Sequence, residues 1–277
     1  MIENEKQNLQ STALLSTIQY PFEFSICTLV TRKSEYQEMM QSYVNKGFTT
    51  DKCEFLHIDN SEKTTFEAYA GLNLFLQKAQ GQYIILCHQD ILIHDSDYND
   101  LLNCIEELDK KDPNWGLLGN AGGLNLKWIG THITEGKTGI VRKEHQLPLR
   151  TITLDENFIV VKKSANLALS HNIAGFHFYG TDICLIARVL GFNSYLINFN
   201  LTHKSNGKKD ASFYKIEKDI RKKYHTAFGA RYITTTFSRF YISGNAFGFW
   251  FFNTKIMLFL ARQYFKFFTS KKEYVLK

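Results

Sequence analysis

Short apolar runs alternate with amphipathic segments through the first part of the chain. Runs rich in aromatic and β-branched residues predict strands over Phe22–Val30, Glu54–Ile58 and Tyr83–Cys87. The segments between these runs have helical spacing and end at Gly47 and Gly81, residues that commonly terminate helices. The resulting order β-α-β-α-β predicts an α/β fold with a doubly wound, largely parallel sheet and helices on both faces.

Capping residues predict where helices start. Ser34 with Gln37, and Thr64 with Glu67, have the spacing of a capping box. Thr181 is predicted to cap a later helix in the same way.

The rest of the first 200 residues continues the α/β pattern. Glycine-rich residues 120–149 show little periodicity, which predicts a long functional loop or a small hairpin. The other predicted elements are helices over Tyr98–Lys110 and Thr181–Leu190 and strands over Trp115–Gly119, Phe158–Lys162 and Ser194–Phe199.

Composition agrees with a globular protein in a reducing compartment. The 277 residues are 44% hydrophobic and 22% charged, which is ordinary for a soluble domain with a large core. The five cysteines include no Cys-x-x-Cys pair, so free thiols are expected. The sequence shows no signal peptide at its start and no apolar run long enough to span a bilayer. We therefore expect a cytoplasmic location.

Polar residues follow each of the first three predicted strands. They are Thr31-Arg32, Asp59-Asn60 and His88-Gln89-Asp90. Ligands of such sheets bind beyond the carboxyl ends of the strands. A carboxylate at Asp90 can hold Mg²⁺ or Mn²⁺ against a diphosphate, although an aspartate that only stabilises a turn is the alternative.

Two later segments also carry candidate chemistry. The glycine-bounded segment Gly175–Asp182 offers Phe176, His177 and Tyr179 as a floor for a sugar, and Asp182 as a general base or as a simple helix-start acid. His203 follows a predicted strand, where it is a metal or phosphate contact or a structural histidine.

The pair Asp155-Glu156 precedes the predicted strand Phe158–Lys162. It is either a solvated turn or a group that hydrogen-bonds sugar hydroxyls.

Several ordered motifs resemble family 2 glycosyltransferases of the GT-A fold, and this resemblance implies a doubly wound mixed sheet with helices on both faces. More specifically, the chain resembles a bacterial branch whose metal motif reads His-Gln-Asp. The resemblance covers roughly residues 22–207. The motifs are Asp59-Asn60, Asn73 in an Ala- and Gly-containing helix, Gly81–Asp90, Thr153–Phe158, Phe176–Leu185, Gly191-Phe192 and His203-x-Ser205-x-Gly207.

The resemblance implies an inverting, nucleotide-sugar-dependent transferase. Hexosyl or deoxyhexosyl transfer in surface glycan or lipid-linked polysaccharide synthesis is expected, with Asp90 and His203 at a Mg²⁺ or Mn²⁺ site and Asp182 as the base. The donor-binding residues would be Thr31, Arg32, Asp59, Asn73, His88, Gln89 and Asp90. The acceptor-binding residues would be Asp155, Glu156, Phe176, His177 and Tyr179.

These observations predict three parts of the chain. Residues 1–20 form a loose arm, 21–207 a catalytic domain and 208–277 a helical extension. The catalytic domain would divide near residue 120 into a nucleotide-sugar half and an acceptor half.

The C-terminal extension is basic and then strongly aromatic, with the cations Arg239, Lys255, Arg262 and Lys266 among the aromatic residues. Such a segment suits peripheral attachment to the inner face of a membrane. Packing on the catalytic domain or a homo-oligomer interface are the alternatives.

Other functional classes fit less well. A Rossmann oxidoreductase needs a G-x-G-x-x-G motif after the first strand, where Val30 is followed by Thr-Arg-Lys-Ser. A non-catalytic module that binds nucleotides or nucleic acid through the basic extension remains the alternative function, although nucleic acid is the less expected partner.

Overall fold

The computed structural model describes residues 18–144, 146–205 and 209–270. The predicted N-terminal arm lies outside these ranges except for residues 18–20. The last two residues of the motif His203-x-Ser205-x-Gly207, together with Lys208, also lie outside them. The chain divides into two compact units, with the boundary between Phe213 and Tyr214.

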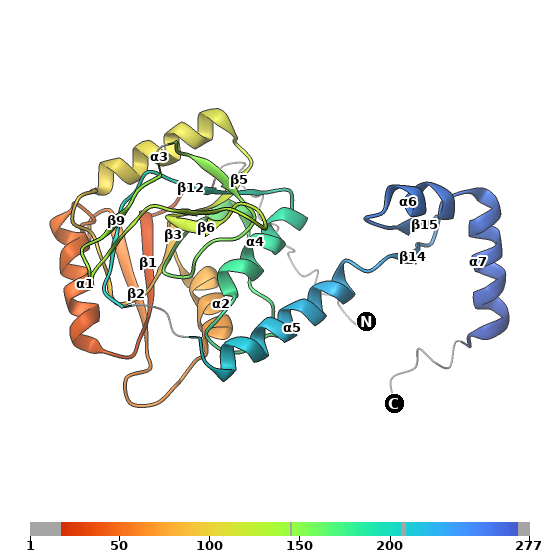
Figure 1. Cartoon of the computed structure of the whole chain (residues 1–277), viewed down its shortest axis with the longest axis horizontal. Coiled ribbons are helices and arrows are strands. Elements are labelled where there is room, and N and C mark those ends of the chain that lie inside the picture. Colours follow the sequence, from red (N-terminus) through yellow and green to blue (C-terminus); the bar gives the residue numbers. More distant parts are fainter. Residues whose placement is uncertain (1–17, 145, 206–208, 271–277) are drawn as a thin grey trace, which may run out of the picture. The chain divides into compact units, whose positions relative to one another are not determined.

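A seven-stranded sheet forms the centre of the first unit (Figure 1). Its strands are β1 (Phe22–Val30), β2 (Cys53–Asp59), β3 (Gly81–Cys87), β5 (Trp115–Gly119), β10 (Leu149–Thr151), β11 (Phe158–Lys162) and β12 (Asn193–Leu196). Their order is β10-β12-β5-β11-β3-β1-β2. β1 runs parallel to β2 and to β3, as predicted, whereas β11 is antiparallel to both β3 and β5. The sheet is therefore mixed.

Four helices cover the two faces of this sheet. They are α1 (Lys33–Asn45), α2 (Ala68–Lys78), α3 (Tyr98–Lys111) and α4 (Tyr179–Val189). Side chains of α1 and α3 share one core with alternate residues of the strands, such as Phe24, Ile26 and Ile85. α2 lies on the other face, where Gly71 approaches the side chains of Leu29 and Ile58.

A second, four-stranded sheet stands beside the first. It is formed by β4 (Ile91–Leu92), β13 (Thr202–His203), β8 (Ile133–Glu135) and β9 (Val141–Arg142), in that order. β6 (Ala121–Gly123) and β7 (Ile129–Thr131) form a separate hairpin, and a short 3₁₀ helix covers Lys163–Ala165. The predicted loop at residues 120–149 is thus built from paired short strands.

The predicted helix starts are wrong at α1, α2 and α4. α1 already begins at Lys33, and its N-cap residue Arg32 makes no side-chain cap. At α2 the amide groups of Thr65 and Phe66 donate to the Asn60 side chain, so this turn occupies the residues expected to begin the helix.

At α4 the N-cap position is Phe178, with φ 65° and no side-chain cap, so Thr181 lies inside the helix. The side-chain capping box instead occurs at α3, between Asp97 and Asp100.

The second unit contains most of α5 (Ala211–Ala227), a hairpin and two helices. The hairpin pairs β14 (Arg231–Thr234) with β15 (Arg239–Ile242), and α6 (Ala246–Phe252) and α7 (Lys255–Phe268) follow. In the part of the chain that the structure describes, no helix combines the length and the hydrophobicity needed to cross a membrane.

Gly81→Ala tests the packing between β1 and β3. A Cβ at Gly81 would lie 2.5 Å from the Ser25 backbone nitrogen, a contact that backbone cannot easily relieve. We expect the free energy of unfolding in a denaturant titration to fall by about 1–3 kcal/mol. Gln82→Ala, at the exposed neighbouring position of the strand, should leave it nearly unchanged. Equal stability of the two variants would contradict the close approach.

Candidate active site

The turn after β3 carries His88, Gln89 and Asp90 past the carboxyl end of the sheet. The His88 amide donates to the Asn157 carbonyl oxygen at 3.0 Å, which continues the pairing with the β11 side of the sheet for one residue. The chain then turns into β4. Asp90 is only 4% exposed, so its carboxylate is held inside this turn rather than in bulk water.

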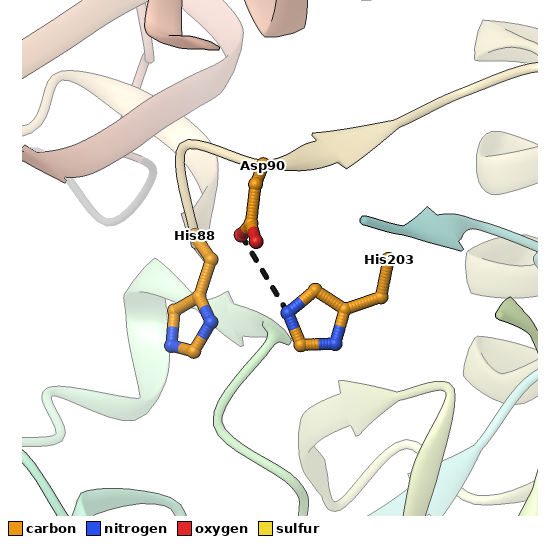
Figure 2. Close-up of side chains that lie close together, drawn as sticks. All are labelled: His88, Asp90 and His203. Atoms are coloured by element: carbon orange, nitrogen blue, oxygen red, sulfur yellow. Dashed lines mark ion pairs between the residues drawn. The ribbon is translucent and has the colours of Figure 1, made fainter. Parts of the chain in front are cut away.

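Strand pairing brings His203 to this turn from far along the sequence. β13 is antiparallel to β4, with His203 opposite Ile91, and the Lys204 amide donates to the Asp90 carbonyl oxygen at 3.1 Å. The His203 Nε2 atom consequently lies 3.5 Å from Asp90 Oδ1, the ion pair drawn in Figure 2.

The three side chains His88, Asp90 and His203 form one cluster (Figure 2). One possible ligand atom from each lies within 4.8 Å of the others. The Tyr179 hydroxyl contacts His88 Nε2 at 2.9 Å and so fixes the orientation of that ring. Two imidazole nitrogens and a carboxylate oxygen can hold a divalent cation and leave coordination positions for ligand oxygens.

The electrostatics of the cluster favour cation binding. Burial by itself would raise the pKa of Asp90, but hydrogen bonds from His203 and Ser205 and the adjacent imidazoles hold it below its usual range. Burial lowers the pKa of His88, and the nearby His203 lowers it further. An ionised carboxylate beside a neutral imidazole is the form in which these groups bind metals.

Gln89 ties the two parallel strand ends together. Its side-chain oxygen accepts from the Thr31 and Arg32 amides at 2.8 and 2.9 Å, and its amide donates to the Thr31 hydroxyl. The side chain is 7% exposed, so these contacts are largely shielded from water. Gln89 therefore fixes the loop after β1 relative to the cluster.

Two adjoining cavities meet at the cluster. One, of about 260 Å³, is lined by residues that include Thr31, Arg32, Gln89 and Asp90. The other, of about 370 Å³, is lined by residues that include Asp155, Glu156, His177 and His203. His88, Phe176 and Ser205 line both. We call them the first and the second cavity.

Most residues predicted to bind the donor line the first cavity, but two do not. Asp59 is ion-paired with Lys33 at 2.8 Å and also accepts from Ser61. Asn73 exchanges hydrogen bonds with the Leu169 backbone and lines a different cavity of about 360 Å³. The structure does not bring Asp59 and Asn73 to the cluster.

The residues predicted to bind the acceptor gather around the second cavity. Asp155, Glu156, Phe176 and His177 line it, whereas Tyr179 lines the first cavity and contacts His88. Phe176 lines both cavities, and the Tyr179 hydroxyl donates to the Glu156 carbonyl oxygen at 2.9 Å, so the five residues stay together around the two cavities.

Asp182 lies away from both cavities. It is fully buried in the first turn of α4, where Ser170 donates to its carboxylate from both the amide, at 2.7 Å, and the hydroxyl, at 2.5 Å. A carboxylate held in this way anchors residue 170 to the helix start.

Glu156, which was predicted to bind the acceptor, lines the second cavity, whereas Asp182, which was predicted as the base, does not. The Glu156 carboxylate accepts backbone N–H groups of Phe178, Tyr179 and Gly180 at the start of α4. Burial, aided by the charge of Asp155, nevertheless raises the pKa of Glu156 to about 8. No sequence motif distinguishes Glu156 from an acidic residue in a solvated turn, so its burial could not be predicted.

Comparison with known proteins places the chain in a family and identifies its fold. No protein-family model matches it. It is 34% identical over 227 residues to "ATP synthase subunits region ORF 6" of Fuscovulum blasticum, which covers 80% of this chain and 91% of that protein. The chain belongs to the family of that ORF 6 protein. Its name states no reaction.

The structural comparison is with S. aureus TarS. Residues 1–349 of TarS, in complex with UDP-GlcNAc, align with a TM-score of 0.50 over 74% of this chain and 67% of that one, at 12% identity. The same part of TarS in complex with UDP gives a TM-score of 0.50 at 11% identity, over 74% and 66% of the two chains. The likeness confirms the predicted fold, a GT-A-like mixed α/β sheet with helices on both faces.

Glu156 makes the free energy of unfolding depend on pH, and replacing this residue should remove that dependence. Because its pKa is raised to about 8 from 4.5, the folded chain binds this proton between those values and the unfolded chain does not. Glu156 therefore makes the free energy of unfolding decrease as pH rises from about 4.5 to 8. We expect Glu156→Gln to flatten this decrease in denaturant titrations at several pH values. Glu106→Gln, at an exposed position of α3, is the control. An unchanged slope in Glu156→Gln would show that the carboxyl is not perturbed.

Proposed function

We propose that this chain is a glycosyltransferase that moves a sugar from a nucleoside-diphosphate sugar to an acceptor hydroxyl with the help of a divalent cation. The observation that carries the proposal is the meeting of two cavities at His88, Asp90 and His203. A two-substrate transfer needs two binding spaces with a charged junction between them. The fold shared with TarS, whose structure was determined with UDP-GlcNAc, supports this reading.

The first cavity would bind the donor and the second the acceptor. Thr31, Arg32 and Gln89 would contact the nucleotide, since they lie beyond the carboxyl ends of β1 and β3. Asp90 and His203, with His88, would hold Mg²⁺ or Mn²⁺ beside the diphosphate. The cation would stabilise the negative charge that gathers on the leaving diphosphate.

We further propose an inverting, family 2 transferase that acts in surface glycan or lipid-linked polysaccharide synthesis at the inner face of a membrane. The sugar would be a hexose or a deoxyhexose. The catalytic domain would cover residues 21–207, with its donor half before about residue 121, and the rest of the chain would be its extension.

Inversion by a single displacement needs a base on the acceptor side of the sugar. Asp182 and Glu156 are the two candidates. Glu156 is favoured because it lines the second cavity, whereas Asp182 is fully buried and lines neither cavity.

A panel of nucleotide sugars tests the function. We expect the full chain to release a nucleoside diphosphate from one donor, only with Mg²⁺ or Mn²⁺ present. Asp90→Asn should lose most of this turnover because it removes the anionic ligand. Asp51→Asn, an exposed change at the opposite end of β2, is the control and should retain activity. Near-normal turnover of Asp90→Asn at saturating metal would remove Asp90 from the metal site. The absence of diphosphate release from every donor would favour a binding module.

Paired carboxylate variants identify the base. Loss of a general base lowers the rate by about 10²–10⁴. We expect Glu156→Gln to lower kcat on this scale with little change in the KM for the donor. Asp182→Asn should mainly lower the free energy of unfolding, by about 1–3 kcal/mol, because a buried hydrogen-bonded charge is lost. Steady-state kinetics and denaturant titration of both variants give the comparison. A folded Asp182→Asn with a large loss in kcat, beside an active Glu156→Gln, would assign the base to Asp182.

A further inference from the structure

A cavity in the second unit combines apolar walls with several cations. It has a volume of about 650 Å³ and lies between the hairpin β14–β15 and helix α7. Leu258 and Phe265 contribute apolar surface, and Arg239, Arg262 and Lys266 contribute positive charge. An apolar space that also presents guanidinium and ammonium groups suits an amphiphile with an anionic head.

The cations of this cavity have no acidic partners nearby in the sequence. Between Asp219 and Glu273 the chain carries ten Lys and Arg residues and no Asp or Glu. Across the described ranges, no ion pair involves Arg239, Arg262 or Lys266. Their charge is therefore available to an external anion.

The opposite face of α7 is apolar and exposed. Residues spaced three or four apart lie on one side of a helix, and this spacing defines what we call the outward stripe. Its members are 51–74% exposed: Ile256, Phe259, Leu260, Tyr264 and Phe267. The cavity-lining residues Leu258 and Phe265 occupy another side of the helix. Contiguous apolar surface of this kind marks an interaction site.

The charge pattern distinguishes between two possible occupants of this face. In a symmetric dimer the same patch meets itself, so two copies of a unit that has no Asp or Glu between Asp219 and Glu273 would bring their excess positive charge together. An anionic lipid surface instead complements the cations and accepts the apolar stripe. With 14 residues, α7 is about 21 Å long, shorter than the hydrocarbon layer of about 30 Å, so it can lie in the interface but not cross it.

We propose that the second unit binds the surface of an anionic bilayer. A lipid phosphate would be held in the cavity by Arg239, Arg262 and Lys266, and the outward stripe of α7 would lie in the headgroup layer. The inference does not depend on sugar transfer, because binding to lipid can be measured without a donor.

Vesicle co-sedimentation of the full chain tests the surface. Vesicles of phosphatidylcholine alone are compared with vesicles in which part of it is replaced by phosphatidylglycerol. We expect binding to the anionic vesicles that weakens with added salt. Phe259→Ser with Phe267→Ser should weaken that binding by about tenfold or more, because two aromatic side chains that would enter the headgroup layer are lost.

Charge variants test the cavity itself. Arg239→Gln with Arg262→Gln should weaken binding to anionic vesicles by about thirtyfold, since each basic residue near such a surface contributes about a fivefold gain. Lys78→Gln with Lys110→Gln removes the same charge from exposed positions of the first unit and should change binding little. Arg262→Lys keeps the charge but loses the planar fork, so a seated phosphate predicts weaker binding here too.

Four results would overturn the proposal. The first is the absence of binding to anionic vesicles. The second is binding of Arg262→Lys to anionic vesicles as tight as that of the unchanged chain, which would show that no lipid phosphate is held in the cavity. The third is tighter binding to a single-stranded oligonucleotide than to anionic vesicles. The fourth is a dimer of the full chain in sedimentation velocity that the double Phe→Ser variant converts to monomer.

Discussion

The pairing of β13 with β4 is the contact on which the candidate site depends. Only Thr202 and His203 take part on one side and Ile91 and Leu92 on the other. Yet this short ladder joins two segments that are far apart in the sequence, and it places an imidazole beside the Asp90 carboxylate. β13 is also paired in parallel with β8, so the small sheet fixes the strand from both sides. The long connections that close this contact carry an entropic cost, which the flanking pairings help to offset.

The strands of the first unit could be predicted from the sequence where they are buried on both faces. β1, β3 and β11 lie in the interior of the sheet, so continuous apolar runs such as Tyr83–Cys87 identify them. The start of α3 at Tyr98 was predicted correctly, but the starts of α1, α2 and α4 were not, because a local motif competes with contacts that only the fold supplies. Asn60 is one case: its side chain holds the turn before α2, where Thr64 and Glu67 otherwise match a capping box.

The same distinction applies to the site. Thr31 and Asp90, which lie just after β1 and β3, border the first cavity as the ends of these strands predict. Asp59, at the end of β2, does not, and it pairs with Lys33 instead. His88 was predicted to contact the donor and was not named as a third possible metal ligand, although its position two residues before Asp90 puts both residues in one turn. Asp182 shows the limit of motif reading. An acid in the first turn of a helix is compatible with catalysis and with structure, and only the Ser170 hydrogen bonds reveal the structural contact.

Asp90 and Glu156 show how one fold gives two carboxyl groups opposite properties. Both are shielded from water, and burial alone would raise both pKa values. Around Asp90, imidazoles and hydroxyl groups outweigh burial, so the group stays anionic and suits a cation. Around Glu156, the negative charge of Asp155 adds to burial, and the helix amides oppose it only in part. A pair of titratable groups with pKa values pushed apart is typical of acid–base sites. The two groups border cavities that share His88, so this electrostatic difference lies where donor and acceptor would meet.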